Sequence, residues 1–414
     1  MKDEEERLIE ESPEGRERLA EKGGGEPVLR TLPDPGAGAA PAPPAPGAAP
    51  RRAVESRSPW QILWRKLRRN RGAMAALVVL AVLYLGSILA GFISPYSYEH
   101  VHSEYGFHPP MLGRVRVFDE RGGLTRPFVY GISITNETSK GYLGYSEDTG
   151  RRYPIRFFVR GDEYTILWIV RSNVHLFGVD EPGLFFPFGS DLFGRDVFSR
   201  IMYGSQVSLS VGIIGILIST IIGMLVGGLA GYYGGVTDFI SMRTVEVILA
   251  IPSLYFVLIL RGAFGSDLTS TQSYILIVVI LSFVGWASEA RVIRGMVLGL
   301  KEQEYILAAR ALGFSRARII INHILPNTVS FVIVTATLSV PFYILSEVAL
   351  SFLGIGIQEP DPSWGNMLTA AQNVAYLENF TWILVPGVFI FVTVMAWNFL
   401  GDGLRDASDP RTLN

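Results

Sequence analysis

Residues Lys301–Asn327 read KEQEYILAARALGFSRARIIINHILPN and lie between two long apolar runs. The segment is basic, and its residues predict two short helices. The first helix spans Glu302–Leu312, which is rich in good helix formers. Gly313 is expected to end it, because glycine accepts the left-handed conformation that terminates many helices. Ser315 can cap the second helix, which Pro326 ends or passes on to the next apolar run.

Small side chains and positive charges share this elbow. Three alanines remove side-chain bulk from the first helix, so another surface can approach it closely, and three arginines surround them. These residues are Ala308, Ala309, Ala311, Arg310, Arg316 and Arg318. A helix–glycine–helix elbow of this kind suits the docking of a soluble partner at a membrane surface. A plain amphipathic linker between two spans is the alternative interpretation.

The composition indicates a membrane protein. The chain has 414 residues, of which 49% are hydrophobic, and its mean hydropathy is positive. The formal net charge of −2 provides no overall basic field for nucleic acid. The chain has no cysteine, which excludes disulfides, thiolate metal sites and a cysteine nucleophile.

The N-terminal residues 1–58 are predicted to form a disordered cytoplasmic tail. Met1–Lys22 is dominated by charge, and Leu32–Pro50 is nearly all Ala, Pro and Gly. Such a composition buries too little apolar area to offset the entropy of ordering the chain. Its acidic start and the lack of an apolar stretch argue against a signal peptide.

Residues 59–98 combine a basic collar with the first predicted transmembrane helix. Trp60–Arg71 contains two tryptophans and five basic residues, a combination that favours the cytoplasmic membrane interface. The uncharged run Gly72–Tyr98 follows and is long enough for a crossing of about 20 residues. The first span should therefore run from inside to outside.

Residues 99–187 are predicted to form an extracytoplasmic β-rich domain. Alternating patches at Arg114–Phe118, Phe128–Tyr130 and Arg156–Arg160 indicate short strands. Predicted turns separate them, at Glu120–Gly123, Thr135–Gly141 and Glu147–Gly150. The arginines of this domain are compatible with an outside location, because the positive-inside bias applies to short loops.

Five further spans are predicted, giving six transmembrane helices with both termini on the cytoplasmic side. They are Ser205–Gly231, Thr244–Leu260, Leu268–Ser288, Asn327–Ser346 and Phe380–Gly401. The loop Arg291–His323 carries six Lys or Arg residues and should be cytoplasmic, whereas Glu347–Asn379 carries none and should be outside. Arg405 and Arg411 place the C-terminal tail inside.

The predicted spans contain candidate residues of a translocation path. Prolines 252, 341 and 386 each remove a backbone hydrogen bond in mid-span, which neighbouring helices or a water-filled cavity can compensate. Charged groups within spans are costly and often functional. The candidate path residues are Glu246, Pro252, Pro341 and Glu347. Ordinary helix packing, pairing of Glu246 with Arg243, and a boundary role for Glu347 are the alternatives.

Enzyme and metal motifs are missing from the sequence. There is no GxxxxGK[ST] loop for binding ATP, no HExxH and no GxSxG elbow. His100, His102 and His108 lie close together in an irregular stretch, which is weak support for a metal. We therefore predict no catalytic residue, no metal site and no cofactor bound by this chain.

The elbow resembles the cytoplasmic loop of the inner-membrane permeases of ATP-binding-cassette importers. That loop carries Glu-Ala-Ala, three residues, Gly, nine residues, an apolar residue, one residue and Leu-Pro. Leu307–Ala309, Gly313, Leu325 and Pro326 fall at this spacing. Two positions depart from the pattern: Leu307 replaces the family's Glu, whose contact Glu304 could supply one turn earlier, and His323 replaces an apolar residue.

Further motifs resemble the C-type permease of the dipeptide, oligopeptide and nickel group, and together they cover 188–411. They are Phe188–Arg200 with Tyr203–Gly204, Ala230–Gly235, Leu350–Gly354 with Pro362–Asn366, and Leu400–Asp406 with Asp409–Arg411. Residues 99–187 exceed the short outer segment of typical members, so this domain is an insert.

The resemblance implies a type I importer permease, an α-helical polytopic protein of a bacterial or archaeal cytoplasmic membrane. It implies a partner permease of the B type, two ATPase subunits that bind ATP and Mg²⁺, an extracytoplasmic peptide-binding protein, and membrane lipid around the spans. The residues implied in ATPase coupling are Glu304, Leu307, Ala308, Ala309, Arg310, Gly313, Leu325 and Pro326. Import of nickel or another small solute, and a membrane-anchored sensor or scaffold, are the alternative functions.

Overall fold

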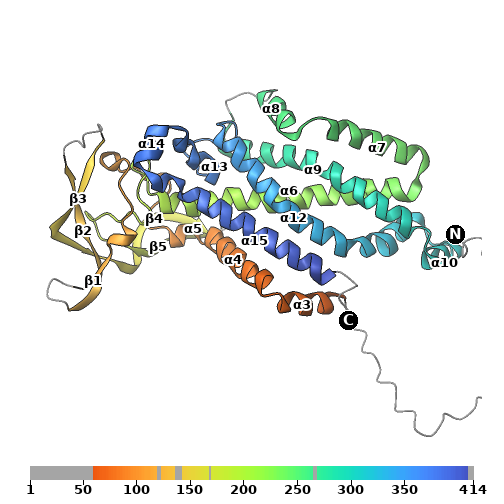
Figure 1. Cartoon of the computed structure of the whole chain (residues 1–414), viewed down its shortest axis with the longest axis horizontal. Coiled ribbons are helices and arrows are strands. Elements are labelled where there is room, and N and C mark those ends of the chain that lie inside the picture. Colours follow the sequence, from red (N-terminus) through yellow and green to blue (C-terminus); the bar gives the residue numbers. More distant parts are fainter. Residues whose placement is uncertain (1–58, 119–122, 136–141, 167–168, 264–267, 409–414) are drawn as a thin grey trace, which may run out of the picture. The chain divides into compact units, whose positions relative to one another are not determined.

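The computed structural model describes residues 59–118, 123–135, 142–166, 169–263 and 268–408. The predicted tail 1–58 and the motif Asp409–Arg411 lie outside the described residues. Five helical segments of the described chain are long and apolar enough to cross a membrane. They are α4 (Arg71–Ile88), α6 (Val197–Tyr233), α9 (Ser270–Leu300), the helical run Arg316–Phe352 that includes α12 (Leu325–Phe352), and Thr381–Ser408, which includes α15 (Val385–Ser408) (Figure 1).

Side-chain caps set the starts of three of these helices. Asn70, which separates α4 from the collar helix α3 (Pro59–Arg69), accepts a hydrogen bond from Ala73 N over 3.1 Å. Asp196 accepts one from Ser199 N at the start of α6. Thr269 forms a reciprocal capping box with Gln272 at the start of α9. Each cap satisfies backbone donors that the first helical turn leaves free.

The predicted span Thr244–Leu260 is divided between two shorter helices. These are α7 (Gly235–Ala250) and α8 (Ser253–Ala263), and neither is long enough to be one of the five candidate spans. The break lies at Ile251, whose φ of −89° and ψ of 121° are extended. Pro252 causes it, because proline disfavours helical geometry in the residue before it.

Helix α6 packs closely against α9 because α6 carries small residues. A Cβ atom added at Gly227 would lie 2.5 Å from the carbonyl oxygen of Ala290, so only glycine allows this approach. The largest buried cluster joins α6, α9 and α12 through residues such as Leu209, Ile277 and Ile344. The glycine-dense second span is therefore part of the packed bundle.

Of the three span prolines, only Pro341 lies inside a helix, where it is buried in α12. Pro386 is the second residue of α15, and Pro252 lies between α7 and α8. The prediction of a mid-helix break is therefore wrong for Pro386. Helix α15 begins at Val385, and a proline in the first turn has no helical hydrogen bond to lose.

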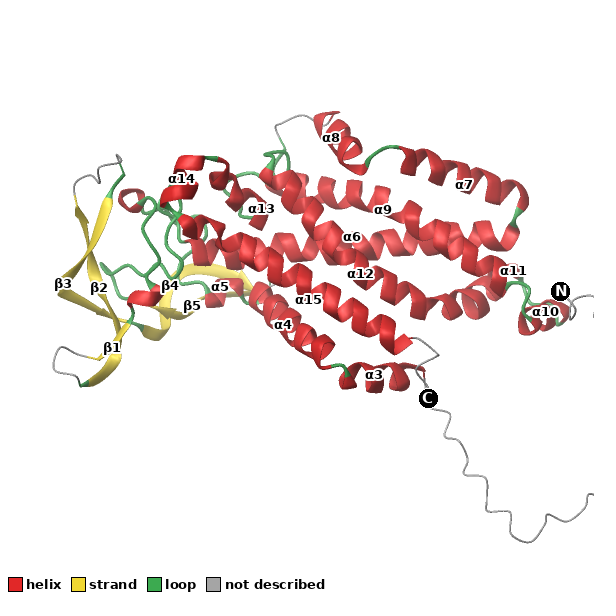
Figure 2. Cartoon of the chain, in the orientation of Figure 1, coloured by secondary structure: helices red, strands yellow, loops and turns green. Residues whose placement is uncertain are grey.

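All named strands lie between α5 (Ala90–Ile93) and α6 in the chain; Figure 2 draws them in yellow. An antiparallel three-stranded sheet has the order β1–β2–β3, and an antiparallel pair is formed by β4 and β5. The bounds are β1 Arg116–Phe118, β2 Leu124–Thr135, β3 Gly144–Pro154, β4 Arg156–Ile166 and β5 Val170–Gly178. Five strands thus lie within the segment where the sequence analysis expects short strands.

One predicted turn, Glu147–Gly150, is wrong. These residues lie inside β3, and the pairing register with β2 shifts there between Tyr130 and Gly131. The amide of Gly150 donates to Asp148 Oδ1 over 3.0 Å, which is a local turn-like contact. The residues predicted to form a turn therefore produce an irregularity within a long strand instead of a chain reversal.

The strands pack on residues that precede α6 and follow α4. Val129 of β2 is buried with Met111, Phe185 and Phe186. In the β4–β5 pair, His175 Nδ1 lies 2.5 Å from the carbonyl oxygen of Ser94, just after α5. This contact ties the β4–β5 hairpin to the end of the first helical segment.

Candidate coupling site

The first elbow helix is α10 (Glu304–Ala311), and it ends with a Schellman motif at Gly313. The amide of Phe314 donates to the carbonyl of Ala309 over 3.1 Å, and the amide of Gly313 donates to the carbonyl of Arg310 over 3.0 Å. Gly313 has a φ of +78°, the left-handed conformation that the motif requires. The predicted glycine stop is confirmed.

The second elbow helix leads directly into the next span. Ser315 caps α11 (Arg316–Ile319) by accepting from Arg318 N over 3.4 Å. A π-helical turn, η3 (Ile320–Ile324), then joins α11 to α12. Pro326 lies in the first turn of α12, so it passes the helix on and does not end it. The second elbow helix is therefore continuous with a candidate span.

The inner face of the elbow is a buried apolar base. Ile306 and Ala309 of α10 pack in one cluster with Ile293 and Val297 of α9 and Tyr232 of α6. Residues from α11, η3 and α12 complete this cluster: Ile319, Ile320, Ile324 and Val332. The elbow is thus seated on the ends of two candidate spans.

The outer face of the elbow exposes apolar side chains. Leu307 is 46% exposed, Leu312 is 74% exposed and Ile321 is 60% exposed. Glu304, Ala308, Arg310 and Pro326 are also exposed, and Leu325 is half-buried. Exposed apolar groups of this density on an ordered base are typical of a docking surface.

Ala309 does not belong to that surface. It is 5% exposed and faces the apolar base, whereas its neighbour Ala308 is exposed. The expectation that both alanines form the floor of the contact is therefore wrong for Ala309. Residues 306 and 309 share one face of a helix by their spacing, and Ile306 is fully buried.

The elbow arginines lie over aromatic rings. The guanidinium carbon of Arg310 is 5.1 Å from the ring centre of Tyr232, and that of Arg316 is 5.7 Å from the ring centre of Tyr233. Both tyrosines belong to the last turn of α6. These cation–π contacts add to the buried base and connect the elbow surface to α6.

His323 occupies a position where the family pattern has an apolar residue, and its ring packs as one. It stacks on Phe314 with ring centres 5.8 Å apart and an angle of 22° between the planes. Asn327 Nδ2 donates to the carbonyl of His323 over 2.6 Å. A flat imidazole therefore supplies the packing surface for the residue that follows the Gly313 cap.

Two family models match this chain. The binding-protein-dependent transport system inner membrane component matches residues 219–414, and the N-terminal TM domain of oligopeptide transport permease C matches residues 58–110. The oligopeptide transport system permease protein OppC of Haemophilus influenzae is 33% identical over 359 residues, which cover 86% of this chain and 90% of that protein. The chain belongs to this family of ATP-binding-cassette importer permeases.

Two more relatives extend this comparison. The dipeptide transport system permease protein DppC of Bacillus subtilis is 35% identical over 351 residues, with 85% of each chain covered. A putative peptide permease protein of Brucella ovis is 43% identical over 225 residues, which cover 54% of this chain and 72% of that protein. An inward-facing structure of the MetNI methionine ABC transporter aligns with 51% of this chain and 97% of that chain, at 18% identity and a TM-score of 0.40.

The permease is therefore a transport subunit of the inner membrane and not an enzyme. Importers of this family operate with ATPase subunits and a substrate-binding protein. The elbow is the part of this chain whose exposed face suits such an ATPase contact.

The four candidate path residues are not brought together in the permease. Glu246 is exposed and pairs with Arg243 over 2.7 Å, so the predicted local pairing is confirmed. Pro252 is exposed between α7 and α8, whereas Pro341 and Glu347 are buried in α12. Their separation follows from the bundle, which turns α12 inward and leaves α7 at its outside.

Glu347 is fully buried and joins three parts of the permease. The hydroxyls of Ser208 and Ser351 donate to its carboxylate over 2.8 and 2.7 Å. These hydroxyls in turn accept from the backbone amides of Trp364 and Ile357, over 3.2 and 3.0 Å. In this conformation Glu347 fastens the predicted outer loop to α6 and α12.

An ion network around two buried arginines joins the motif Phe188–Arg200 to Glu359 of the predicted outer loop, and sequence reasoning missed it. Arg200 is 1% exposed, and its NH2 group lies 2.9 Å from Glu359 Oε1. Arg195 pairs with both Asp191 and Glu359, over 2.7 and 2.5 Å. A cavity of about 300 Å³ adjoins these four charges. The charged residues are visible in the sequence, but the contact between Arg200 and Glu359 spans about 160 residues.

Glu289 was also missed, because the predicted span ended at Ser288. Helix α9 continues to Leu300, so Glu289 lies well within a candidate span, close to Gly223 of α6. No hydrogen bond or ion pair joins it to any other described residue. An ionisable group within a membrane span is costly, so such a position is a candidate for a functional residue.

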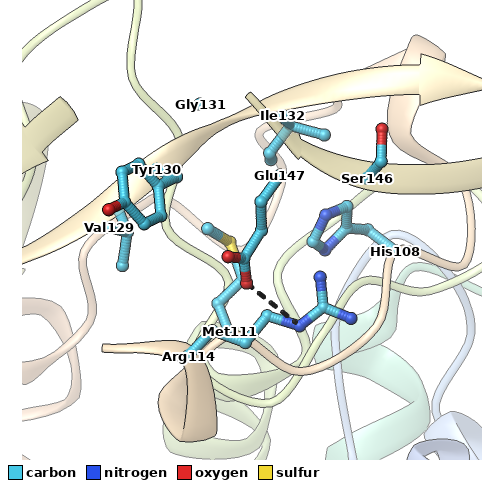
Figure 3. Close-up of a pocket in the computed structure, with 9 residues that line it drawn as sticks. All are labelled: His108, Met111, Arg114, Val129, Tyr130, Gly131, Ile132, Ser146 and Glu147. Atoms are coloured by element: carbon cyan, nitrogen blue, oxygen red, sulfur yellow. Dashed lines mark ion pairs between the residues drawn. The ribbon is translucent and has the colours of Figure 1, made fainter. Parts of the chain in front are cut away.

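The histidines do not assemble into a metal site. Among the described residues, no group of three or more potential ligands could hold a metal ion. His100 and His102 stack with ring centres 4.5 Å apart, and His108 lies in a separate pocket of the β-rich segment (Figure 3). That pocket has a volume of about 10 Å³, enough for about one water molecule. Burial lowers the pKa of His108 to about 4.

Proposed function

We propose that this chain is the C-type pore subunit of an importer that moves dipeptides or oligopeptides into the cell. The exposed apolar face of the elbow, at Leu307, Leu312 and Ile321, carries the proposal, because it presents a docking surface on a base formed by candidate spans. The names of the relatives OppC and DppC support peptides as the substrate class.

The proposed complex contains a homologous B-type permease, two ATPase subunits and an extracytoplasmic peptide-binding protein. ATP and Mg²⁺ bind to the ATPase subunits. Closure of the ATPase pair moves the elbow as one body, since the Gly313 cap and the cluster around Ile306 hold α10 against α6 and α9. The helical run from Arg316 to Phe352 carries that movement toward the outer loop.

The proposed topology has six spans, with both termini in the cytoplasm and the strands outside. Five of these spans are the long apolar helical segments, and the remaining one consists of α7 and α8 in succession, broken at Pro252. The domains are the tail 1–58, the collar and first span 59–98, the insert 99–187 and the permease core 188–411. The basic elbow and the uncharged loop after Glu347 support this orientation.

Cysteine labelling tests the topology. The chain has no cysteine of its own, so a single cysteine gives an unambiguous signal. Thr125→Cys, at an exposed strand position, should react with a membrane-impermeant thiol reagent in intact cells, and Ala317→Cys in the elbow should react only after lysis. Labelling of Ala317→Cys in intact cells would reverse the proposed orientation.

For the translocation path we propose Glu289 of α9 together with Pro252 at the α7–α8 break. Pro341 and Glu347 act from within the bundle, where Glu347 holds the outer loop in place. A carboxylate that lacks a partner in the single chain is suited to the amino group of a peptide.

An uptake assay tests the function. Deletion of the gene should abolish ATP-dependent uptake of labelled di- and tripeptides, and the wild-type gene should restore it. Glu289→Gln should restore less uptake than wild type, whereas Glu104→Gln, an exposed substitution in the outer segment, should restore it fully. Unchanged peptide uptake in the deletion strain, with loss of nickel uptake, would refute the peptide assignment.

A further inference from the structure

An open cleft of about 430 Å³ lies between α7 and α9, and the elbow function does not involve it. The residues that line this α7–α9 cleft are Gly235, Asp238, Phe239, Met242, Arg243, Glu246, Arg291 and Arg294. Beside it, Lys301 Nζ donates to the carbonyl of Gly231, so the α6–α7 junction adjoins the start of the elbow. The cleft therefore belongs to the end of the bundle that carries the elbow.

Three arginines and two acidic residues line the cleft, so one positive charge remains after two ion pairs have formed. Arg294 is paired with Asp238 through two contacts of 2.8 and 2.5 Å, and Arg243 is paired with Glu246 over 2.7 Å. Arg291 is exposed and makes no ion pair or hydrogen bond with any described residue. An anion that enters the cleft would meet a free guanidinium with two neutralised pairs beside it.

Apolar side chains continue outward from the charged groups. Phe239 lines the cleft and is exposed, and on the side of Arg291 away from the elbow Val247 and Ile251 are exposed as well. The opposite face of α7 is buried against α9 through Val245 and Ile248. In the proposed topology Val247 and Ile251 belong to the broken span formed by α7 and α8, where the acyl chains of a bound lipid can reach them.

We propose that the α7–α9 cleft binds the headgroup of an anionic phospholipid, with its phosphate on Arg291 and its acyl chains along Val247 and Ile251, away from the elbow. A guanidinium forms strong charge-assisted hydrogen bonds to phosphate oxygens. Basic pockets between helices at the cytoplasmic side of a membrane suit such headgroups. Phosphatidylglycerol has both the required charge and the required chains.

Native mass spectrometry of the full chain in detergent tests the site, with phosphatidylglycerol, phosphatidylcholine and inorganic phosphate as probes. Wild type should bind phosphatidylglycerol at least about tenfold more tightly than phosphatidylcholine. Arg291→Gln should weaken phosphatidylglycerol binding about tenfold. Arg65→Gln removes an exposed arginine of the basic collar and should change binding less than about twofold. Millimolar phosphate should not displace the lipid.

Three outcomes would overturn the proposal: equal affinity for the two lipids, an equal loss in both arginine variants, or displacement of phosphatidylglycerol by inorganic phosphate. A photocrosslinker on Met242→Cys in the assembled importer separates lipid from protein occupants. We expect a lipid adduct, and an adduct with another protein subunit instead would assign the cleft to a subunit interface.

Discussion

The same substitution at two adjacent elbow residues should have different consequences. Ala308→Glu adds a carboxylate to an exposed helix surface, where the expected change in unfolding free energy is within about 0.5 kcal/mol. Ala309→Glu places the same group against Ile306, Ile293 and Val297 in the apolar base. An unpaired charge at a buried position costs roughly 3–5 kcal/mol.

Hydrogen exchange of the α10 amides measures the local cost. At about 1.4 kcal/mol per factor of ten, Ala309→Glu should speed exchange by at least about 100-fold, and Ala308→Glu by about twofold or less. ATP hydrolysis stimulated by the binding protein should be lost in both, for different reasons. In Ala308→Glu the elbow is folded but its docking surface is blocked.

Ala308→Ser is the matched control, since it adds little bulk and no charge, and it should retain stimulated hydrolysis. Normal stimulation in Ala308→Glu would show that the exposed face of α10 is not the ATPase contact. Unchanged exchange in Ala309→Glu would refute the assignment of Ala309 to the apolar base.

Three further predictions concern the cap, the ion network and pH. Gly313→Ala should destabilise the elbow by about 1 kcal/mol and Gly313→Asn by less. No atom lies within 4 Å of a Cβ added at Gly313, so only the left-handed backbone conformation opposes a side chain there. Equal hydrogen-exchange rates in the two variants would contradict this reasoning. Glu359→Gln removes the nearest carboxylate from buried Arg200 and leaves Asp191 at 3.7 Å, so it should lower stability by roughly 1.5–3 kcal/mol. Asp180→Asn, which breaks an exposed pair, should cost under about 1 kcal/mol, and similar melting temperatures would refute the role of the network. Burial lowers the pKa of His108 to about 4, so between pH 6.5 and 4 the unfolded chain binds a proton that the folded chain does not, and stability falls as the pH drops through this window. Denaturation at pH 7 and at pH 4.5 should therefore show a loss of stability that is about 2 kcal/mol larger in wild type than in His108→Phe. Equal losses would contradict the burial argument.

Local signals in the sequence predicted much of this fold. The cap at Gly313 and the start of α11 at Ser315 were predicted correctly because each depends on residues within one helical turn. Five of the six predicted spans correspond to long apolar helices, because an apolar run of sufficient length has few other stable states in a membrane. The break at Pro252 divided the remaining one.

The candidate site was predicted less completely. The elbow residues were located, but the side of the helix on which each lies depends on what packs beneath it. Ala308 and Ala309 have the same chemistry, and only the cluster around Ile306 decides that one is exposed and the other is buried. The elbow arginines were expected around a docking patch, yet Arg310 and Arg316 lie over tyrosines from the end of α6.

The sequence by itself determined the apolar spans, the helical elbow with its glycine cap and the strand-forming character of the segment before α6, because each of these depends on neighbours a few positions away. Only the tertiary structure decided that Glu359 meets Arg200 and that Glu347 is buried beneath the loop at Trp364. It also decided that Arg291 has no ion-pair partner among the described residues, beside two neutralised pairs. Charge pairing in a bundle is a property of distance in space. A charged side chain meets its partner only after helices that are far apart in the sequence have packed against one another.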